Sequence, residues 1–350
     1  PISADVYDLT VEGTHNFFAN EILVHNCSEV LLTTEPMAFD GLSAEQDQDY
    51  NSKQNGEIAL CILSNINFGK LPNIGRLDLL TSLLVRFLDN LIDYQHYPLN
   101  AAKYATERSR YLGIGISDYA HFLAKNEARV GSKKAINLTF KWTERFQYGL
   151  TKASIQLAKE RGPAKHLSES LYGEGMLPID TYNKGVHDVI EPHFLCDWES
   201  LRKDLQTFGI RNLALSAVPP AASSAIVSNS TQGIDPITDA IEVYEANNFT
   251  VKNLIPDSHK LKYYMKAWEL DNDDYLNLIA VMQIFIDQSL STNQWYDLNK
   301  YVGKQLKAKD VKINILKAWK RGVKTLYYLR TNDKIDTTET SGCDGGACSI

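Results

Sequence analysis

Long segments with helical periodicity alternate with short apolar segments along this chain, and that alternation is the strongest constraint on its fold. Segment Arg76–Gln95 repeats apolar residues every three to four positions, the pattern of a helix with one buried face. Three further segments are predicted helices: Lys134–Arg161, Tyr275–Leu290 and Lys312–Leu326. Tyr275–Leu290 is apolar nearly all round and is therefore expected to be buried. Leu112–Ile116 and Leu213–Ala217 are predicted strands. Strands that alternate with long helices favour an α/β fold.

Composition limits the classes of protein to which the chain can belong. Its 350 residues are 44% hydrophobic, which is enough to bury a large core. The net charge of -7 argues against a protein that coats nucleic acid, because such a protein needs a basic face. A small phosphorylated ligand is compatible with this charge, since one phosphate needs only a helix N-terminus and a few donors. No apolar run approaches the roughly 20 residues that span a bilayer, and the first residues lack the features of a signal peptide. We therefore expect a cytoplasmic protein with no membrane or nucleic-acid partner.

The first 26 residues have the pattern of short strands. Val6–Val11 alternates apolar and polar side chains, Gly13–Asn16 predicts a turn, and the apolar residues of Phe17–Val24 favour further strands. The run that ends at Asn26 and is followed by Cys27 resembles the C-terminal splice region of inteins. An ordinary β-hairpin is the alternative interpretation of the same residues.

The intein resemblance implies a self-cleavage site at the bond between Asn26 and Cys27. The side-chain amide of Asn26 would attack its own carbonyl, His25 would polarise that carbonyl, and His15 would assist from the neighbouring strand. Cys27 would be the thiol that accepts the upstream extein. Because the N-terminal splice region is absent, this chain alone could at most cleave itself at Asn26, and splicing would need a partner fragment.

Five cysteines are too few for a disulfide-stapled secreted fold, so their positions carry the information. Cys27 and Glu29 are separated by one residue, and in an extended segment both side chains point to the same side. A thiol and a carboxylate can therefore address one substrate face, where the carboxylate can act as a general base. Cys196 has no partner pattern and is predicted to be structural.

The last residues place Cys343 and Cys348 in a glycine-rich segment without apolar periodicity, which is typical of a mobile tail. Thiol exchange needs an accessible thiolate and a mobile backbone, and this segment offers both. The alternative is a metal site, but two ligands are too few for structural zinc. The tail is therefore predicted to be redox-active.

Five motifs in one colinear order resemble the C-terminal half of the large subunit of class I ribonucleotide reductases. They are Cys27-Ser-Glu29, the segment Asn55–Ser64 around Cys61, Leu215–Ser224, Gly322–Tyr328, and the pair Cys343 and Cys348. The resemblance implies that Cys27 becomes a thiyl radical that removes the ribose 3′ hydrogen, with Glu29 as base for the 3′ hydroxyl. It also implies that Cys61 supplies one of two reducing thiols, whose partner belongs to the absent N-terminal half.

The same resemblance assigns roles to the tyrosine pair and the tail. Tyr327 and Tyr328 would relay a radical from the small subunit to Cys27. A Tyr-Tyr dipeptide is common in itself, since Tyr263-Tyr264 is another, so this assignment depends on position. The two tail cysteines would reduce the active-site disulfide by thiol exchange.

Ser223 and Ser224 match the hydroxyl positions of the family's diphosphate-binding turn. A proline-led helix start offers free N–H groups and hydroxyls to a phosphate, although without the family match it is equally a serine-capped helix. Ala222 stands where some members carry a glutamate, so that contact is absent or made by backbone. The family's asparagine two residues before Cys27 is not visible. The loop between Cys27 and Cys61 is longer than is typical and indicates a surface insertion.

The implied fold is α/β: the second half of a ten-stranded α/β barrel over residues 27–330, preceded by the intein remnant at 1–26 and followed by a flexible redox tail at 331–350. Leu112–Ile116 contains two glycines but no third in register, so it is predicted to be a closely packed barrel strand and not a dinucleotide loop. The implied activity is reduction of ribonucleoside diphosphates to deoxyribonucleotides, with no metal or cofactor bound in this chain.

The implied partners are the upstream N-terminal half, which would carry the ATP and dNTP effector sites, a metal-containing, radical-generating small subunit, and thioredoxin or glutaredoxin. Alone, the chain is expected to be inactive as a reductase. Two alternatives stay open: that its own activity is processing at the Asn26–Cys27 bond, or that it is a scaffold that no longer catalyses. The intact set of cysteines and tyrosines argues against the scaffold.

Overall fold

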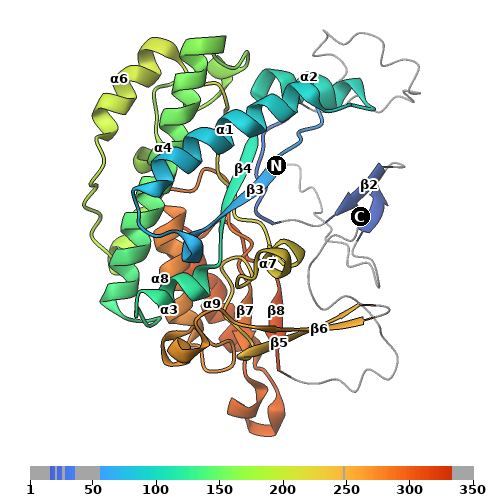
Figure 1. Ribbon diagram of the computed structural model, residues 1–350, viewed down its shortest axis with the longest axis vertical. Coiled ribbons are helices and arrows are strands. Elements are labelled where there is room, and N and C mark those ends of the chain that lie inside the picture. Colours follow the sequence, from blue (N-terminus) through green and yellow to red (C-terminus); the bar gives the residue numbers. More distant parts are fainter. Residues whose placement is uncertain (1–15, 20–21, 26–27, 36–55, 247–248, 333–350) are drawn as a thin grey trace.

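The computed structural model describes residues 16–19, 22–25, 28–35, 56–246 and 249–332, which form a mixed α/β structure. Helices gather on one side of the central strands, and a long hairpin projects away from the helical side (Figure 1). The mixed α/β class agrees with the alternation in the sequence. No helix in the described ranges combines the length and apolar character needed to cross a membrane.

Parallel strands and strand-like segments form the centre of the structure. β3 (Ile62–Asn67) pairs in parallel with β4 (Leu112–Ser117). On its other edge, β4 bonds the segment 214–218, as in the hydrogen bond from Ile114 N to Leu215 O (2.9 Å). The segment 214–218 in turn bonds residues 288–291, as in the hydrogen bond from Val218 N to Ser289 O (3.0 Å). Residues 288–291 lead into β7 (Gln294–Tyr296), which pairs in parallel with β8 (Leu329–Thr331).

Five consecutive parallel segments therefore lie side by side in chain order: 62–67, 112–117, 214–218, 288–296 and 327–331. Within the described ranges the array does not close, so the predicted ten-stranded barrel is not seen as such. The predicted strand Leu112–Ile116 is confirmed as part of β4. The predicted strand Leu213–Ala217 joins the array through a parallel bridge between Ile114 and Ser216 and through backbone hydrogen bonds.

The helices connect and cover the parallel segments. α1 (Arg76–Tyr94) and α2 (Asn100–Ser109) link β3 to β4, and α4 (Lys133–Arg161) packs against α1 and α8 (Asn272–Gln283). The remaining α-helices are α3 (Tyr119–Lys125), α5 (Pro178–Thr181), α6 (Trp198–Phe208), α7 (Ser223–Ser228) and α9 (Ala308–Lys320). Short 3₁₀ turns occur at Phe68–Lys70, Leu167–Glu169, Lys184–Asp188, Ser258–Tyr263, Leu298–Lys300 and Val302–Lys304.

The two longest helices follow the predicted ranges closely. α1 buries a stripe that includes Leu77, Val85, Leu88 and Ile92. The apolar face predicted for this helix is confirmed only at Leu88 and Ile92, because Phe87 is 57% exposed and Leu80, Leu84 and Leu91 are half-buried. α4 begins after Ser132, whose hydroxyl accepts a hydrogen bond from Ala135 N (3.1 Å) and so caps the first turn. These helices are therefore encoded by local sequence.

The two C-terminal helices differ from the prediction at their ends. The helix predicted over Tyr275–Leu290 is α8, which ends at Gln283, and the following residues join the parallel array. Phe285 and Ile286 lie in the turn after α8, where both backbone N–H groups bond Met282 O. Both side chains are buried, so the apolar pattern continues past the end of the helix, which is why periodicity did not predict that end. The helix predicted over Lys312–Leu326 is α9, which ends before Gly322, a glycine with φ of 82°.

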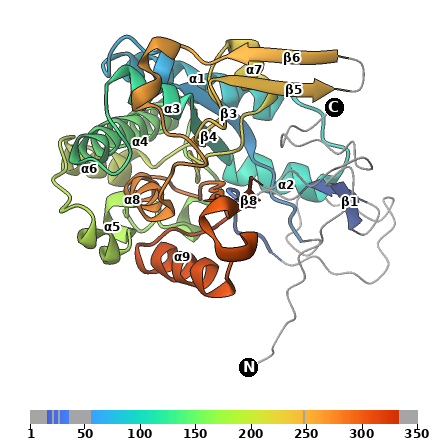
Figure 2. The ribbon, with the colours of Figure 1, turned by 90° about the horizontal axis from the view of Figure 1, so that it is seen from below.

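Two hairpins complete the described structure. β1 (Asn16–Ala19) pairs antiparallel with β2 (Ile22–His25), which confirms strand structure in part of the first 26 residues. The predicted strand Val6–Val11 lies outside the described residues. β5 (Ile241–Ala246) and β6 (Phe249–Leu254) form a second hairpin that the sequence pattern did not predict. It projects from the body in both views (Figure 2).

Two predicted irregular segments fall largely outside the described residues. The loop predicted between residues 37 and 56 is described only at Gly56, and the tail predicted from residue 331 is described only at Thr331 and Asn332. Thr331 is the last residue of β8, and Asn332 Oδ1 accepts a hydrogen bond from Leu298 N (2.8 Å). The first two residues of the predicted tail therefore contact the rest of the described structure.

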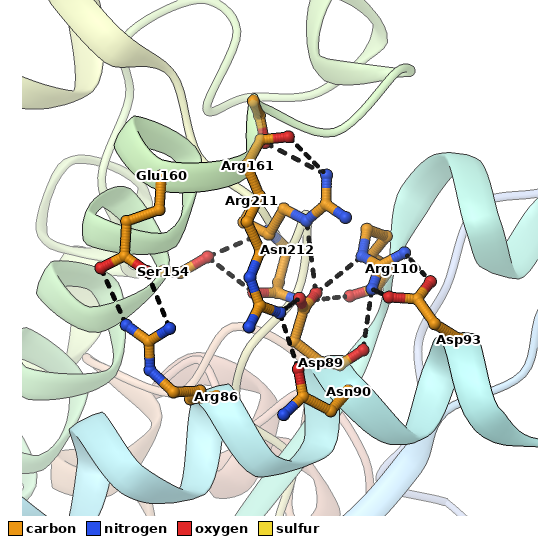
Figure 3. A network of polar contacts seen from close by, with 11 residues as sticks. Arg86, Asp89, Asn90, Asp93, Arg110, Ser154, Glu160, Arg161, Arg211 and Asn212 are labelled. Carbon is orange, nitrogen blue, oxygen red and sulfur yellow. Dashed lines mark hydrogen bonds and ion pairs between the residues drawn. The ribbon is translucent and has the colours of Figure 1, made fainter.

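A buried ion-pair network fixes the start of β4 relative to α1 and α4 (Figure 3). Asp89 of α1 is fully buried and accepts hydrogen bonds from Arg110 Nε (2.6 Å) and Arg161 Nη1 (2.9 Å). Asn212 donates to the same carboxylate (3.3 Å), and Arg110 also pairs with Asp93 (2.8 Å). Arg110 precedes β4 and Asn212 precedes the segment 214–218, so the Asp89 carboxylate bonds the start of both.

Candidate functional site

Glu29 lies against the fourth segment of the parallel array. Its backbone carbonyl accepts a hydrogen bond from Ser289 N (2.9 Å), so the chain around Glu29 runs beside residues 288–291. The side chain is fully buried, and the Ser291 hydroxyl donates to carboxylate Oε2. The other oxygen, Oε1, has no hydrogen-bond partner among the described residues. A buried carboxylate with one open lone-pair site is suited to accept a proton or hydrogen bond from a ligand.

Cys61 directly precedes β3 and lies beside the same segment. Its Sγ accepts a hydrogen bond from Gln288 Nε2 (3.4 Å). Burial raises the pKa of the Cys61 thiol to about 12, the hydrogen bond from Gln288 opposes that rise, and the charge of Glu29 adds to it. The structure thus brings together Cys61 and Glu29, two residues that the sequence analysis assigned to one site.

A glycine of β4 makes room for this thiol. A Cβ atom on Gly113 would lie 2.6 Å from Cys61 Sγ and 2.4 Å from a methyl carbon of Leu63. At Gly115 it would lie 2.4 Å from Asn65 Oδ1 and 2.7 Å from Ala217 O. The two glycines therefore allow β3 and the segment 214–218 to pack closely on β4, which confirms the predicted close packing of this strand.

Tyr327 and Tyr328 lie at the fifth segment, with their rings in contact. The ring centroids are 3.8 Å apart at an interplanar angle of 41°, and the Tyr327 hydroxyl donates to the Tyr328 hydroxyl (3.0 Å). Tyr327 N bonds Thr292 O (2.8 Å), directly after Ser291, which contacts Glu29. The tyrosine pair is therefore held next to the strand that holds Glu29. Two phenols in hydrogen-bond contact are the arrangement that stepwise proton and electron transfer requires.

Ser223 and Ser224 begin α7, and both are exposed. The turn that precedes them starts at Val218, whose backbone bonds both Ser289 and Ser291 (3.0 Å each). The predicted phosphate turn is therefore continuous with a strand that flanks the Glu29 segment. The helix that it starts is short and ends at Ser228.

Several predicted site residues lie outside the described residues: His15, Asn26, Cys27, Cys343 and Cys348. His25 is the last residue of β2, and its backbone is in register with Asn16. Cys196 is half-buried, and burial raises the pKa of its thiol to about 11. In the described ranges, no three or more His, Cys, Asp or Glu side chains lie together in a way that could hold a metal ion.

Sequence reasoning missed two residues of this cluster, Gln288 and Ser291. Gln288 lies inside the segment that was predicted to be a helix and Ser291 directly follows it, so their side chains were given no role. Their contacts reach Cys61 and Glu29 across 227 and 262 positions of sequence. A local signal does exist, because polar residues directly after a buried apolar run commonly mark the end of a strand where sites form.

A separate cavity of about 900 Å³ lies on the other side of Gln288 and Leu31. Its lining includes Tyr111, His166, Tyr172 and Asp287. Glu29, Cys61, the serine pair and the tyrosine pair do not line it. Gln288 and Leu31 line the cavity, so it adjoins the cluster without including the predicted site residues.

The sequence matches the protein family described as "Ribonucleotide reductase, barrel domain" over residues 10–329. The chain belongs to this family. The matched range contains Glu29, Cys61, the two serines of α7 and the tyrosine pair, so every predicted site residue that the structure describes from Glu29 to Tyr328 falls inside the reductase barrel domain. It also begins inside the segment that was predicted to be an intein remnant.

Individual relatives agree with the family match. The chain is 40% identical over 329 residues to the ribonucleoside-diphosphate reductase subunit alpha of Haemophilus influenzae, an alignment that covers 93% of this chain and 42% of that protein. It is 37% identical over 336 residues to the protein of the same name from Buchnera aphidicola subsp. Schizaphis graminum, covering 93% and 43%. It is 38% identical over 315 residues to the ribonucleoside-diphosphate reductase subunit alpha of Enterobacteria phage T4, an alignment that covers 86% of this chain and 41% of that protein. The chain thus spans less than half the length of these relatives.

Proposed function

We propose that this chain is the C-terminal part of the barrel of a class I ribonucleoside-diphosphate reductase large subunit. Its activity would be the reduction of ribonucleoside diphosphates to deoxyribonucleotides for DNA synthesis. The observation that carries the proposal is the cluster around residues 288–291, where the Glu29 carboxylate and the Cys61 thiol are held by one strand. Membership of the barrel-domain family supports the same activity.

The proposed chemistry follows from the arrangement of these groups. Cys27, as a thiyl radical, would remove the ribose 3′ hydrogen, and Glu29 would accept the proton of the 3′ hydroxyl. The open oxygen of the buried Glu29 carboxylate suits that role. Cys61 and a second cysteine elsewhere in the subunit would supply two electrons and become a disulfide. Cys343 and Cys348 would then reduce that disulfide by exchange.

Two further elements would serve the same reaction. Tyr328 and Tyr327 would pass the radical to Cys27, and their hydroxyl contact of 3.0 Å supports a proton-coupled transfer between them. Ser223 and Ser224, exposed at the start of α7, would bind the substrate diphosphate through their hydroxyls.

We propose residues 27–330 as the reductase part and 331–350 as the redox tail. Five parallel segments are half of a ten-stranded barrel, which supports an upstream half that completes it. That half would carry the effector sites for ATP and dNTP. A metal-containing small subunit would supply the radical, and thioredoxin or glutaredoxin would supply reductant. Reducible cysteines with these roles fit the cytoplasm, where thiols are kept reduced.

Reconstitution of the complete enzyme tests this proposal. The chain is combined with the upstream part of a related subunit alpha and with a matching small subunit, and conversion of CDP to dCDP is measured. We expect turnover that is abolished by Cys61→Ser and by Glu29→Gln, and retained by the matched control Cys196→Ser. Stable association of all three polypeptides without any dCDP would overturn the proposal.

We also propose that residues 1–26 are the C-terminal remnant of an intein. The supporting observations are the order of His25, Asn26 and Cys27 and the antiparallel hairpin that ends directly before Asn26. The test is the intact mass of the purified chain, alone and after mixing with an upstream fragment. Loss of residues 1–26 would support the intein, whereas a full-length mass that stays unchanged in both samples, as is expected of the non-cleaving variant Asn26→Ala, would overturn it.

A further inference from the structure

Gln288 connects three segments that are distant in sequence. Its Oε1 accepts a hydrogen bond from Leu31 N (3.0 Å), two residues beyond Glu29. Its Nε2 donates to Leu112 O at the start of β4 (3.1 Å) and to Cys61 Sγ (3.4 Å). The side chain is 1% exposed, so no water competes for these bonds. One amide therefore fixes the relative position of the Glu29 strand, the thiol and β4.

The orientation of this amide is determined by its surroundings. Leu31 presents an N–H group and Leu112 presents a carbonyl, so turning the amide over would oppose donor to donor and acceptor to acceptor. The amide N–H group must therefore face Leu112 and Cys61. The sulfur of Cys61 consequently always meets a donor, and a donor binds a thiolate more strongly than it binds a neutral thiol.

We propose that Gln288 is a positioning residue for the reductase reaction, which holds Cys61 and the Glu29 strand in register and stabilises the Cys61 thiolate through its amide N–H. The role of Gln288 in the reductase reaction rests on the proposed function, whereas its effect on the Cys61 thiolate does not. Thiolate, not thiol, is the nucleophile and the leaving group in disulfide exchange. A donor at the sulfur would therefore favour release of Cys61 when its disulfide is reduced.

Two other features of the site make this donor important. Burial and the charge of Glu29 both disfavour the thiolate, and the amide of Gln288 is the side-chain donor that the described residues provide to counter them. Gly113 leaves space for the sulfur over β4, so the thiol can approach the amide. The position of Cys61 thus depends on a donor on one side and a missing side chain on the other.

The test measures alkylation of individual cysteines in the full chain by peptide mass spectrometry at pH 8.5. The rate at Cys61 is divided by the rate at Cys196, which is also half-buried and lies outside this cluster. We expect Gln288→Leu to lower this ratio about tenfold, because a hydrogen bond to a charged group contributes about that factor. Iodoacetamide and the larger N-ethylmaleimide should give the same fold-change. A variant that alters the reactivity of the thiol affects both reagents equally, whereas one that alters access to the thiol affects the larger reagent more.

Further variants keep the proposal falsifiable. Gln288→Glu retains shape but replaces the donor with an acceptor, so it should lower the ratio at least as much as Gln288→Leu. Tyr263→Phe, which changes a residue that has no role in this cluster, should leave the ratio unchanged. An unchanged or raised ratio in both Gln288 variants, or a change that differs between the two reagents, would overturn the proposal.

A second measurement separates this inference from the proposed function. In the reconstituted enzyme, Gln288→Leu should lower kcat with dithiol reductant and leave KM for CDP near the wild-type value, because the amide bonds Leu31, Leu112 and Cys61 and not the serines proposed to bind the diphosphate. If the wild-type assembly forms no dCDP while the alkylation ratio falls as expected, the proposed function fails and the role of Gln288 toward the thiol stands. If turnover is normal and both Gln288 variants match wild type in kcat and alkylation, the inference fails alone.

Discussion

The hydroxyl of Ser291 donates a hydrogen bond to the carboxylate of Glu29, although the two residues are 262 positions apart in the sequence. The Ser28 hydroxyl also lies 3.2 Å from that of Ser291, so the start of the reductase part is bonded to the fourth parallel segment by side chains as well as by backbone. The buried carboxylate depends on this one described donor, and its second oxygen is left for a ligand.

Removal of the Ser291 hydroxyl should therefore affect both activity and stability. Ser291→Ala leaves a fully buried carboxylate without its donor, which costs roughly 1–3 kcal/mol of unfolding free energy. In the reconstituted enzyme we expect a lower kcat for CDP reduction, because Glu29 is no longer oriented. Urea denaturation and steady-state kinetics measure the two effects. Ser291→Thr keeps the hydroxyl and should behave like wild type; equal losses in both variants would contradict the assigned contact.

The tyrosine pair gives a prediction about the radical relay. Tyr328→Phe removes the hydroxyl that accepts from Tyr327, so proton-coupled transfer between the rings is interrupted. We expect dCDP formation in the reconstituted enzyme to fall to background, with a melting temperature close to that of wild type. The matched control is Tyr263→Phe, which changes the chain's other adjacent tyrosine pair. Retained turnover in Tyr328→Phe would exclude a relay through this hydroxyl.

Asp89 should be a main determinant of stability because it is the buried centre of the ion-pair network. Asp89→Ala leaves Arg110, which is 3% exposed, without its closest partner, and removal of one partner of a buried pair costs roughly 3–5 kcal/mol. Asp93 pairs with the same arginine, but its side chain is 54% exposed, so Asp93→Ala should cost only about 0–1 kcal/mol. Chemical denaturation of the two variants measures the difference, and similar losses would contradict the central role of Asp89.

Glu160 gives a prediction about acid stability. Hydrogen bonds from Arg86 lower the pKa of this carboxyl from its usual 4.5 to about 2. A group whose pKa is lower in the folded state stabilises the fold above its unfolded pKa, and this contribution is lost as the pH falls from about 4.5 toward 2. NMR titration should show the low pKa in wild type and a return toward the usual value in Arg86→Leu. Gln156→Ala, which removes a weaker donor, should give a smaller change.

Local patterns predicted the parts of the fold whose contacts are local. α1 and α4 follow from apolar spacing and from the Ser132 cap, and β4 follows from its apolar run. The motifs predicted that Cys61 and Glu29 belong to one site. The sequence could not predict Gln288, because its role arises from segments far apart in the chain. The end of α8 at Gln283 was missed because Phe285 and Ile286, which are buried in the turn after the helix, continue its apolar pattern.

The parallel array has a consequence for the time at which this site can form. Its neighbouring segments are separated by whole helices, and the bonds from residues 288–291 to Cys61 and Glu29 close loops of 227 and 262 positions. Closing such long loops costs conformational entropy before the contacts contribute stability, so these non-local contacts form late and slowly. The helices that precede residue 288 can gain structure early, whereas the thiol and the carboxylate meet their strand only after residues 288–291 have been synthesised. Cys61 is thus left without its hydrogen-bond partner until the parallel segments have assembled.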